Sequence, residues 1–172
     1  MKNLFSKGKI DPVILGIIGF FVLLLLGSLI FLFSSAKENK TVTYSKSDAE
    51  RPKLQIEKTN IDLGRIKVAD KKISVIKLKN VGSKPLQITN VFTSCDCTSA
   101  QLVINGQESP VFSMHENPTW VGELQPNAEA TLKAIYEPYK MPVHGAVERT
   151  IYFKTNDPDK TDVQIQMKAN VN

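Results

Sequence analysis

The chain has 172 residues and a net charge of +5, a length that allows one folded domain plus an appendage. Residues 53–172 hold 15 basic and 13 acidic residues, a net charge of +2, whereas the first 52 residues carry +3. No basic stripe with interleaved aromatic residues occurs, so the composition argues against a nucleic-acid partner.

The N-terminal segment is predicted to be a membrane anchor. Residues 13–33 carry no charge and are interrupted only by three glycines and one serine. A helix of this length spans roughly 30 Å, which matches the hydrocarbon core of a bilayer. The alternative is a cleavable signal peptide, but its apolar region usually has only about 7–15 residues. We therefore expect a cytoplasmic N-terminus over residues 1–11 and an uncleaved signal anchor, a transmembrane helix, over residues 12–34.

Basic residues before the apolar run predict its orientation. Lys2, Lys7 and Lys9 precede the run, opposed by Asp11. Because positively charged flanks tend to stay in the cytoplasm, the rest of the chain is expected to lie outside it, on a cell membrane crossed once. Residues 35–52 are polar and of mixed charge, which predicts a flexible linker.

From residue 53 onward the apolar pattern has a period of two. Short alternating segments are separated by Gly, Pro, Asn and Asp turns, and no amphipathic helix is indicated. Some seven short strands in about 120 residues predict an all-β fold, an immunoglobulin-like antiparallel β-sandwich over residues 53–172. Arg149 is a misfit in one alternation, where it falls among Val147, Ile151 and Phe153.

Both cysteines lie one residue apart, at the end of a predicted strand. In an extended Cys95-Asp96-Cys97 segment the two cysteine side chains share a face. They could form a disulfide within the tripeptide, chelate a soft metal such as Cu(I) or Zn(II), or bridge to another chain. A disulfide ring this small is expected to be strained and reducible, although it could also simply stiffen the strand end. The Asp96 carboxylate is expected to disfavour thiolates beside it.

Histidines and methionines add a second reason to consider a metal. Met114 precedes His115 directly, and Met141 lies three residues before His144, in two predicted loops. Thioether, imidazole and thiolate ligands together suit copper better than calcium or magnesium. The predicted ligands of a copper cofactor are Cys95, Cys97, Met114, His115, Met141 and His144, and the redox candidates are Cys95 and Cys97.

The β-region resembles a bacterial immunoglobulin-like family of unknown function that is related to Hydin-type domains. The resemblance rests on Asn80-Val81-Gly82, Pro85-Leu86-Gln87-Ile88, Ser94-Cys95-Asp96-Cys97-Thr98, Tyr136-Glu137-Pro138, Gly145 and Thr155-Asn156-Asp157-Pro158. The family's usual motif is Ser-Cys-Gly-Cys-Thr, so Asp96 replaces a glycine here. Between residues 99 and 125 the chain departs from the family pattern. The resemblance implies a sandwich fold and export, but no established reaction.

These observations favour a membrane-anchored, extracytoplasmic binding or assembly module with a soft-metal site at its Cys-x-Cys loop end. The alternatives are a thiol–disulfide redox protein that uses the same pair and a purely structural interaction domain. We do not expect an enzyme, because no Ser/His/Asp hydrolase signature, phosphate loop or His-Glu-x-x-His motif is present. The expected partners are the membrane and another protein.

Overall fold

A computed structural model describes residues 12–34, 41–115, 117 and 119–172, without the side chains of residues 12, 15 and 29–34. The chain divides into two compact units, residues 1–38 and 39–172. The predicted cytoplasmic N-terminus, residues 1–11, lies outside the described residues.

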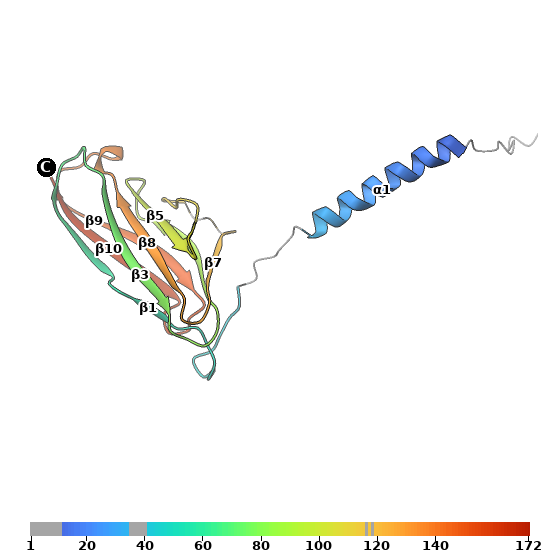
Figure 1. The fold of residues 1–172 in the computed structure, drawn as a ribbon. Coiled ribbons are helices and arrows are strands. Elements are labelled where there is room, and N and C mark those ends of the chain that lie inside the picture. Colours follow the sequence, from blue (N-terminus) through green and yellow to red (C-terminus); the bar gives the residue numbers. More distant parts are fainter. Residues whose placement is uncertain (1–11, 35–40, 116, 118) are drawn as a thin grey trace, which may run out of the picture. The chain divides into compact units, whose positions relative to one another are not determined.

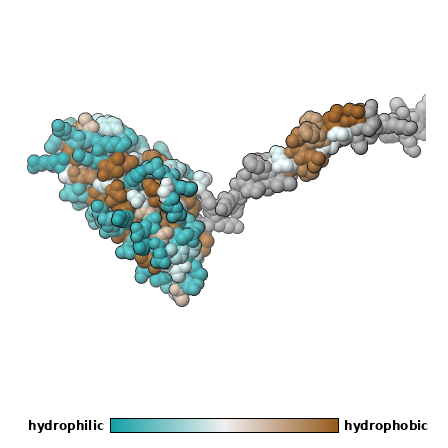
Figure 2. All heavy atoms as spheres, viewed as in Figure 1, coloured by the Kyte–Doolittle hydropathy of each residue, from teal (hydrophilic) through white to brown (hydrophobic). Residues whose placement is uncertain are grey.

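The first unit contains one described helix, α1, Pro12–Ser34 (Figure 1). Large apolar side chains along it are exposed, from 48% for Val22 to 70% for Leu23. Figure 2 shows hydrophobic residues over most of the described part of this helix. Within the part of the chain that the structure describes, no helix has the combined length and apolar character of a membrane span. The helix predicted over residues 12–34 is confirmed by α1. Membrane anchoring stays a prediction.

The second unit is a β-sandwich of two five-stranded sheets (Figure 1). One sheet has the order β1–β3–β8–β5–β6, and the other has the order β2–β10–β9–β4–β7. The pairings are antiparallel apart from that of β2 with β10. The described strands are β1 Leu54–Ile56, β2 Asn60–Ile66, β3 Lys72–Asn80, β4 Leu86–Thr93, β5 Thr98–Ile104, β6 Gln107–Glu108, β7 Val121–Leu124, β8 Glu129–Tyr136, β9 Gly145–Thr155 and β10 Asp162–Val171.

The sandwich prediction is confirmed, but the described residues form ten strands rather than about seven. Asp62 and Gly64 are residue types that predict a turn over residues 61–64, but these residues lie inside β2, whose Gly64 has a φ of +67°. The segment directly after the cysteines is β5. Since β4 belongs to one sheet and β5 to the other, the two cysteines lie where the chain crosses between the sheets.

Two clusters of buried side chains fill the space between the sheets. The larger contains fully buried residues from both sheets, such as Leu132 of β8 and Ile165 of β10. Burying one such side chain contributes about 1.5–3 kcal/mol. The smaller cluster, at one end of the sandwich, comprises Ile66, Cys95, Cys97, Tyr136, Ala169 and Val171. The cysteines are thus part of the packed end of the domain.

Residues 41–52, which belong to the expected linker, pack on the sandwich. The Val42 backbone N–H donates to the Gln87 side chain at 2.8 Å. Arg51 forms an ion pair with Asp159 at 2.9 Å, and Pro52 is buried. The described residues 41–52 of the expected linker thus pack on the sandwich, and the remainder of that linker lies outside the described residues.

Candidate functional site

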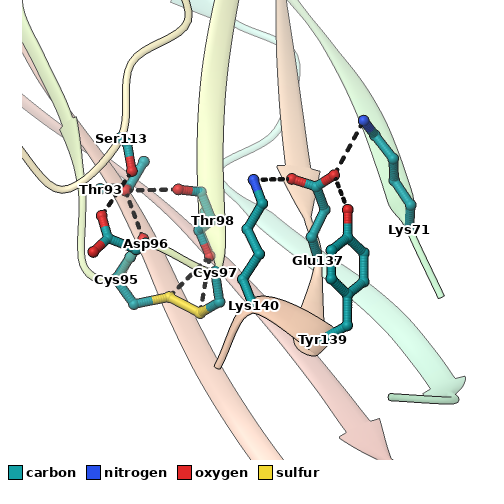
Figure 3. Close-up of polar contacts among 10 residues, drawn as sticks. All are labelled: Lys71, Thr93, Cys95, Asp96, Cys97, Thr98, Ser113, Glu137, Tyr139 and Lys140. Atoms are coloured by element: carbon teal, nitrogen blue, oxygen red, sulfur yellow. Dashed lines mark hydrogen bonds and ion pairs between the residues drawn. A yellow bond between two sulfur atoms is a disulfide. The ribbon is translucent and has the colours of Figure 1, made fainter. Parts of the chain in front are cut away.

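Cys95 and Cys97 lie in a tight turn between β4 and β5 and are joined by a disulfide (Figure 3). Their Cα atoms are 5.3 Å apart, whereas residues i and i+2 of an extended strand lie about 6.6 Å apart. The expectation of an extended Cys-x-Cys segment is therefore wrong. The Thr93 hydroxyl lies 3.0 Å from the carbonyl oxygen of Cys95 and 2.9 Å from that of Thr98, to which it can donate, and so closes the turn.

Hydrogen bonds fix this turn to its neighbours on both sides. The Ser94 N–H donates to the carbonyl oxygen of Thr150, and the Ser94 hydroxyl accepts from the Thr150 N–H, both at 2.9 Å. The Ser113 hydroxyl donates to the Asp96 carboxylate at 3.0 Å. The Glu137 N–H donates to the Cys97 carbonyl oxygen at 2.8 Å. The turn is thus held by hydrogen bonds to β9 and to two loops, in addition to the disulfide.

The two sulfur atoms have different surroundings. Cys97 is fully buried, whereas Cys95 keeps 7% of its surface exposed. The Arg149 Nε donates to the Cys97 Sγ at 3.1 Å, and the Arg149 guanidinium lies 5.9 Å from the centre of the Tyr136 ring. The Thr98 hydroxyl lies 3.4 Å from the Cys95 Sγ and 3.9 Å from the Cys97 Sγ. Cationic contact is therefore concentrated on Cys97.

Arg149 was not among the residues predicted to form the site. Its only sequence signal was a charged residue at an inward-facing position of a β-alternation. The structure explains the misfit, because the half-buried Arg149 side chain reaches the disulfide across the end of the sandwich. Cys97 lies 52 residues earlier in the sequence, so the pattern alone could not supply this partner.

A buried carboxylate adjoins the same turn. Glu137 accepts a hydrogen bond from the Tyr139 hydroxyl at 2.6 Å and forms ion pairs with Lys140 and, at 3.2 Å, with Lys71 (Figure 3). These contacts, that of Lys140 foremost, lower the pKa of Glu137 to about 2 from the ordinary 4.5, although burial acts in the opposite direction. The cluster anchors the loop that follows β8 beside Cys97.

Replacing Glu137 with glutamine is expected to flatten the acid dependence of stability. Since the folded-state pKa lies below the ordinary value, ionised Glu137 stabilises the fold fully above pH 4.5, and this contribution is lost as the pH falls through about 2. Urea unfolding of the full chain between pH 2 and 7 measures the effect. We expect Glu137→Gln to be less stable at pH 7 and to lose less stability on acidification.

The matched control is Glu129→Gln, because Glu129 is an exposed carboxylate that pairs with Lys79. Exposed pairs contribute little, so this variant should keep the acid dependence of the unchanged chain. If the free energy of unfolding of Glu137→Gln fell with acid as steeply as that of the unchanged chain, the acid dependence would not come from Glu137.

The predicted metal ligands are only partly brought together. Met114 and Met141 are 43% and 47% exposed, and His115 and His144 are exposed as well. Their loops adjoin the cysteine turn through the contacts of Ser113 and Glu137. Within the described ranges, however, no group of three or more His, Cys, Asp or Glu side chains could hold a metal ion. Both sulfur atoms are also joined to each other, whereas a soft metal binds thiolates. The copper prediction gains no support, and its six-residue ligand set stays a prediction.

Residues 54–110 match the model of a family described as a protein of unknown function, DUF1573. The DUF1573 match covers β1 to β6 and contains the cysteine turn. It agrees with the resemblance seen in the sequence, namely to a family without an established reaction. No curated protein matches the chain in sequence.

Several solved structures share the fold. A protein of unknown function from Porphyromonas gingivalis W83 has a TM-score of 0.54 and 21% identity, with 71% of this chain and 48% of that chain covered. A family 123 glycoside hydrolase from Clostridium perfringens has a TM-score of 0.50 and 10% identity, with 71% and 27% covered. The human CEP192 ASH/PapD-like domain has a TM-score of 0.47 and 12% identity, with 78% and 97% covered.

These similarities concern the fold alone, because every identity is low. The chain spans about half the length of the Porphyromonas gingivalis protein. The two structures with TM-scores of 0.54 and 0.50 agree with a two-sheet β-sandwich.

Proposed function

We propose that this protein is a membrane-anchored, extracytoplasmic β-sandwich that binds a partner protein and exchanges its Cys95–Cys97 disulfide with the partner's thiols. The observation that carries the proposal is the contact of the Arg149 guanidinium with the Cys97 sulfur, 3.1 Å from Nε to Sγ. A cation at this position stabilises the thiolate that forms when the disulfide opens.

A purely structural role explains the disulfide less well. In the chain-entropy model, a ring closed over so few residues adds only about 1–2 kcal/mol to stability, less than the ~3 kcal/mol of a 15-residue loop. The hydrogen bonds of Thr93, Ser94 and Asp96 already hold the turn. The disulfide therefore adds little to the stability of a turn that hydrogen bonds also hold. Thiol–disulfide exchange is the better reason for two cysteines at this position.

The proposed location rests on two further observations. Exposed apolar side chains along α1, such as Phe20 at 61% and Leu25 at 69%, would gain favourable burial in a bilayer. Disulfides persist mainly outside the cytoplasm, in oxidising compartments. A cytoplasmic N-terminus with an exported β-domain satisfies both.

Two kinds of experiment test this proposal, one of the location and one of the redox chemistry. For the location, a membrane-anchored chain should stay in the membrane fraction after a carbonate wash, and proteolysis of sealed inverted vesicles should spare its β-domain. For the redox chemistry, the full chain is isolated from membranes and titrated. Equilibration with thiol–disulfide buffers should show reversible reduction of the Cys95–Cys97 pair at a potential less negative than about −300 mV, above the range of structural disulfides.

The control is the double variant Cys95→Ser, Cys97→Ser, which should fold and show no redox transition. A disulfide that stays oxidised in buffers more reducing than about −300 mV would mark a structural bridge. Release of the chain by carbonate would contradict the anchor. Titration of the reduced chain with Cu(I) tests the metal alternative, and stoichiometric binding that is lost in His115→Ala would favour it over disulfide exchange.

A further inference from the structure

We propose that Arg149 sets the direction of thiol exchange, so that an incoming thiolate attacks Cys95 and Cys97 leaves as the thiolate. This inference rests on the proposed redox function, and it assigns separate roles to the two sulfur atoms and a catalytic role to a residue outside the Cys-x-Cys motif.

The positive charge of Arg149 lies at Cys97. Arg149 donates through Nε to the Cys97 Sγ and through Nη1 to the Glu148 carbonyl oxygen at 2.8 Å. Its guanidinium also lies against the Tyr136 ring, a contact that holds an arginine in place. Among the described residues, Arg149 forms no ion pair with a carboxylate. Its charge is therefore available to a negative charge that develops on Cys97.

The two cysteines also differ in their exposure to solvent. Cys95 retains 7% of its surface, and Cys97 retains none. Of the two residues, only Cys95 has surface that solvent reaches, so we infer that a reagent from solvent attacks its side of the disulfide. The sulfur that departs is then the buried one, and a buried thiolate is unfavourable unless a cation or hydrogen-bond donor faces it. Arg149 supplies both at Cys97, whereas the neutral Thr98 hydroxyl is the side-chain hydrogen-bond partner of Cys95.

The Asp96 carboxylate, between the two cysteines, works against either thiolate. Its Oδ1 accepts a hydrogen bond from the Ser113 hydroxyl at 3.0 Å. This contact holds the carboxylate against the loop of Ser113, while Arg149 contacts the sulfur of Cys97 directly. The local cation therefore offsets the acidic neighbour that the sequence places inside the motif.

The exchange proceeds in two balanced steps. A thiolate of a dithiol partner forms a bond to the Cys95 Sγ as the bond between the two cysteines breaks, and the electron pair remains on the Cys97 Sγ. The partner's second thiolate then attacks the partner's first sulfur, which is bonded to Cys95 in the mixed disulfide. This step forms the partner's disulfide and releases the Cys95 thiolate. Both thiolates take up protons, so the partner dithiol is oxidised and the cysteine pair is reduced by two electrons.

The first test measures how fast dithiothreitol reduces the full chain. Without a cation beside the leaving sulfur, Arg149→Met should react about tenfold more slowly at pH 7. Arg149→Lys should recover most of the rate, since it restores the charge, whereas a role in packing alone predicts no such recovery. The matched control is Lys154→Met, which removes an exposed cation from the same strand and should leave the rate unchanged.

The second test needs no variant and so does not depend on the folding of Arg149→Met. The unchanged chain is treated with the monothiol 2-mercaptoethanol, quenched with iodoacetamide and mapped by peptide mass spectrometry. We expect the monothiol on Cys95 and the alkyl group on Cys97. A monothiol found mainly on Cys97, or equal reduction rates for the unchanged chain and folded Arg149→Met, would overturn this inference alone. A disulfide that dithiothreitol cannot reduce would instead overturn the proposed redox function.

Discussion

Replacing Asn80 with alanine is expected to destabilise the β-domain by about 3 kcal/mol. The Asn80 side chain is fully buried at the end of β3. Its amide group donates to the carbonyl oxygens of Lys84 and Leu124, at 2.8 and 3.0 Å. Its oxygen accepts from the N–H groups of Gly82 and Lys53, at 3.0 and 3.3 Å. Alanine would leave these backbone groups without a partner, and urea unfolding of the full chain measures the loss.

Two further variants sharpen this test. Asn80→Asp preserves the shape but replaces two donors with an acceptor that faces two carbonyl oxygens, so it should be at least as destabilising as alanine. Asn60→Ala, at an exposed position of β2, should change the free energy of unfolding by less than about 0.5 kcal/mol. A loss below about 1 kcal/mol in Asn80→Ala would show that these backbone groups find other partners.

A methyl group at Gly82 is expected to have an effect of similar size, about 2–4 kcal/mol. A Cβ there would lie 2.3 Å from the Arg51 carbonyl oxygen and 2.5 Å from the Lys53 nitrogen. Both are backbone atoms, and their segment is fixed because the Ser83 N–H donates to the Arg51 oxygen and the Val81 N–H to the Lys53 oxygen. Gly82→Ala therefore cannot be relieved by moving a side chain, and its urea midpoint should fall.

Gly106→Ala separates crowding from backbone conformation. A Cβ at Gly106 would meet no atom within 4 Å, but its φ is +77°, so alanine there carries only a conformational penalty of about 1 kcal/mol. If Gly82→Ala were no more destabilising than Gly106→Ala, the close approach of residues 51–53 would not be what requires glycine at position 82.

The sequence predicts best the long strands in which buried and exposed side chains alternate. Strand β10 alternates buried and exposed side chains throughout, and its period of two was recognised. The pattern does not predict β5, because its first three residues, Thr98 to Ala100, are all buried and show no alternation. It does not predict β2, because Asp62 and Gly64 are typical turn residues, although Gly64 adopts its positive φ within the strand.

For the candidate site, the sequence located the cysteines but could not determine their state. Alternation cannot reveal that the chain crosses between sheets at Asp96, because a crossover depends on strands far apart in sequence. The loops of His115 and His144 do approach the turn, through Ser113 and Glu137. Among the described residues, their exposed imidazoles nevertheless join no group of three or more His, Cys, Asp or Glu side chains, since loop position alone does not determine the direction of a side chain.

The cysteine turn and the packed segment of residues 41–52 lie at opposite ends of the sandwich. The segment contacts Gln87 near the start of β4, and the turn follows Thr93, the last residue of this eight-residue strand. At about 3.3 Å per residue, the six residues from Gln87 to Thr93 separate them by roughly 20 Å. A large protein can therefore reach the disulfide without colliding with the polypeptide that leads into the domain. The described segment before β1 would therefore leave the disulfide end open to the partner of the proposed exchange.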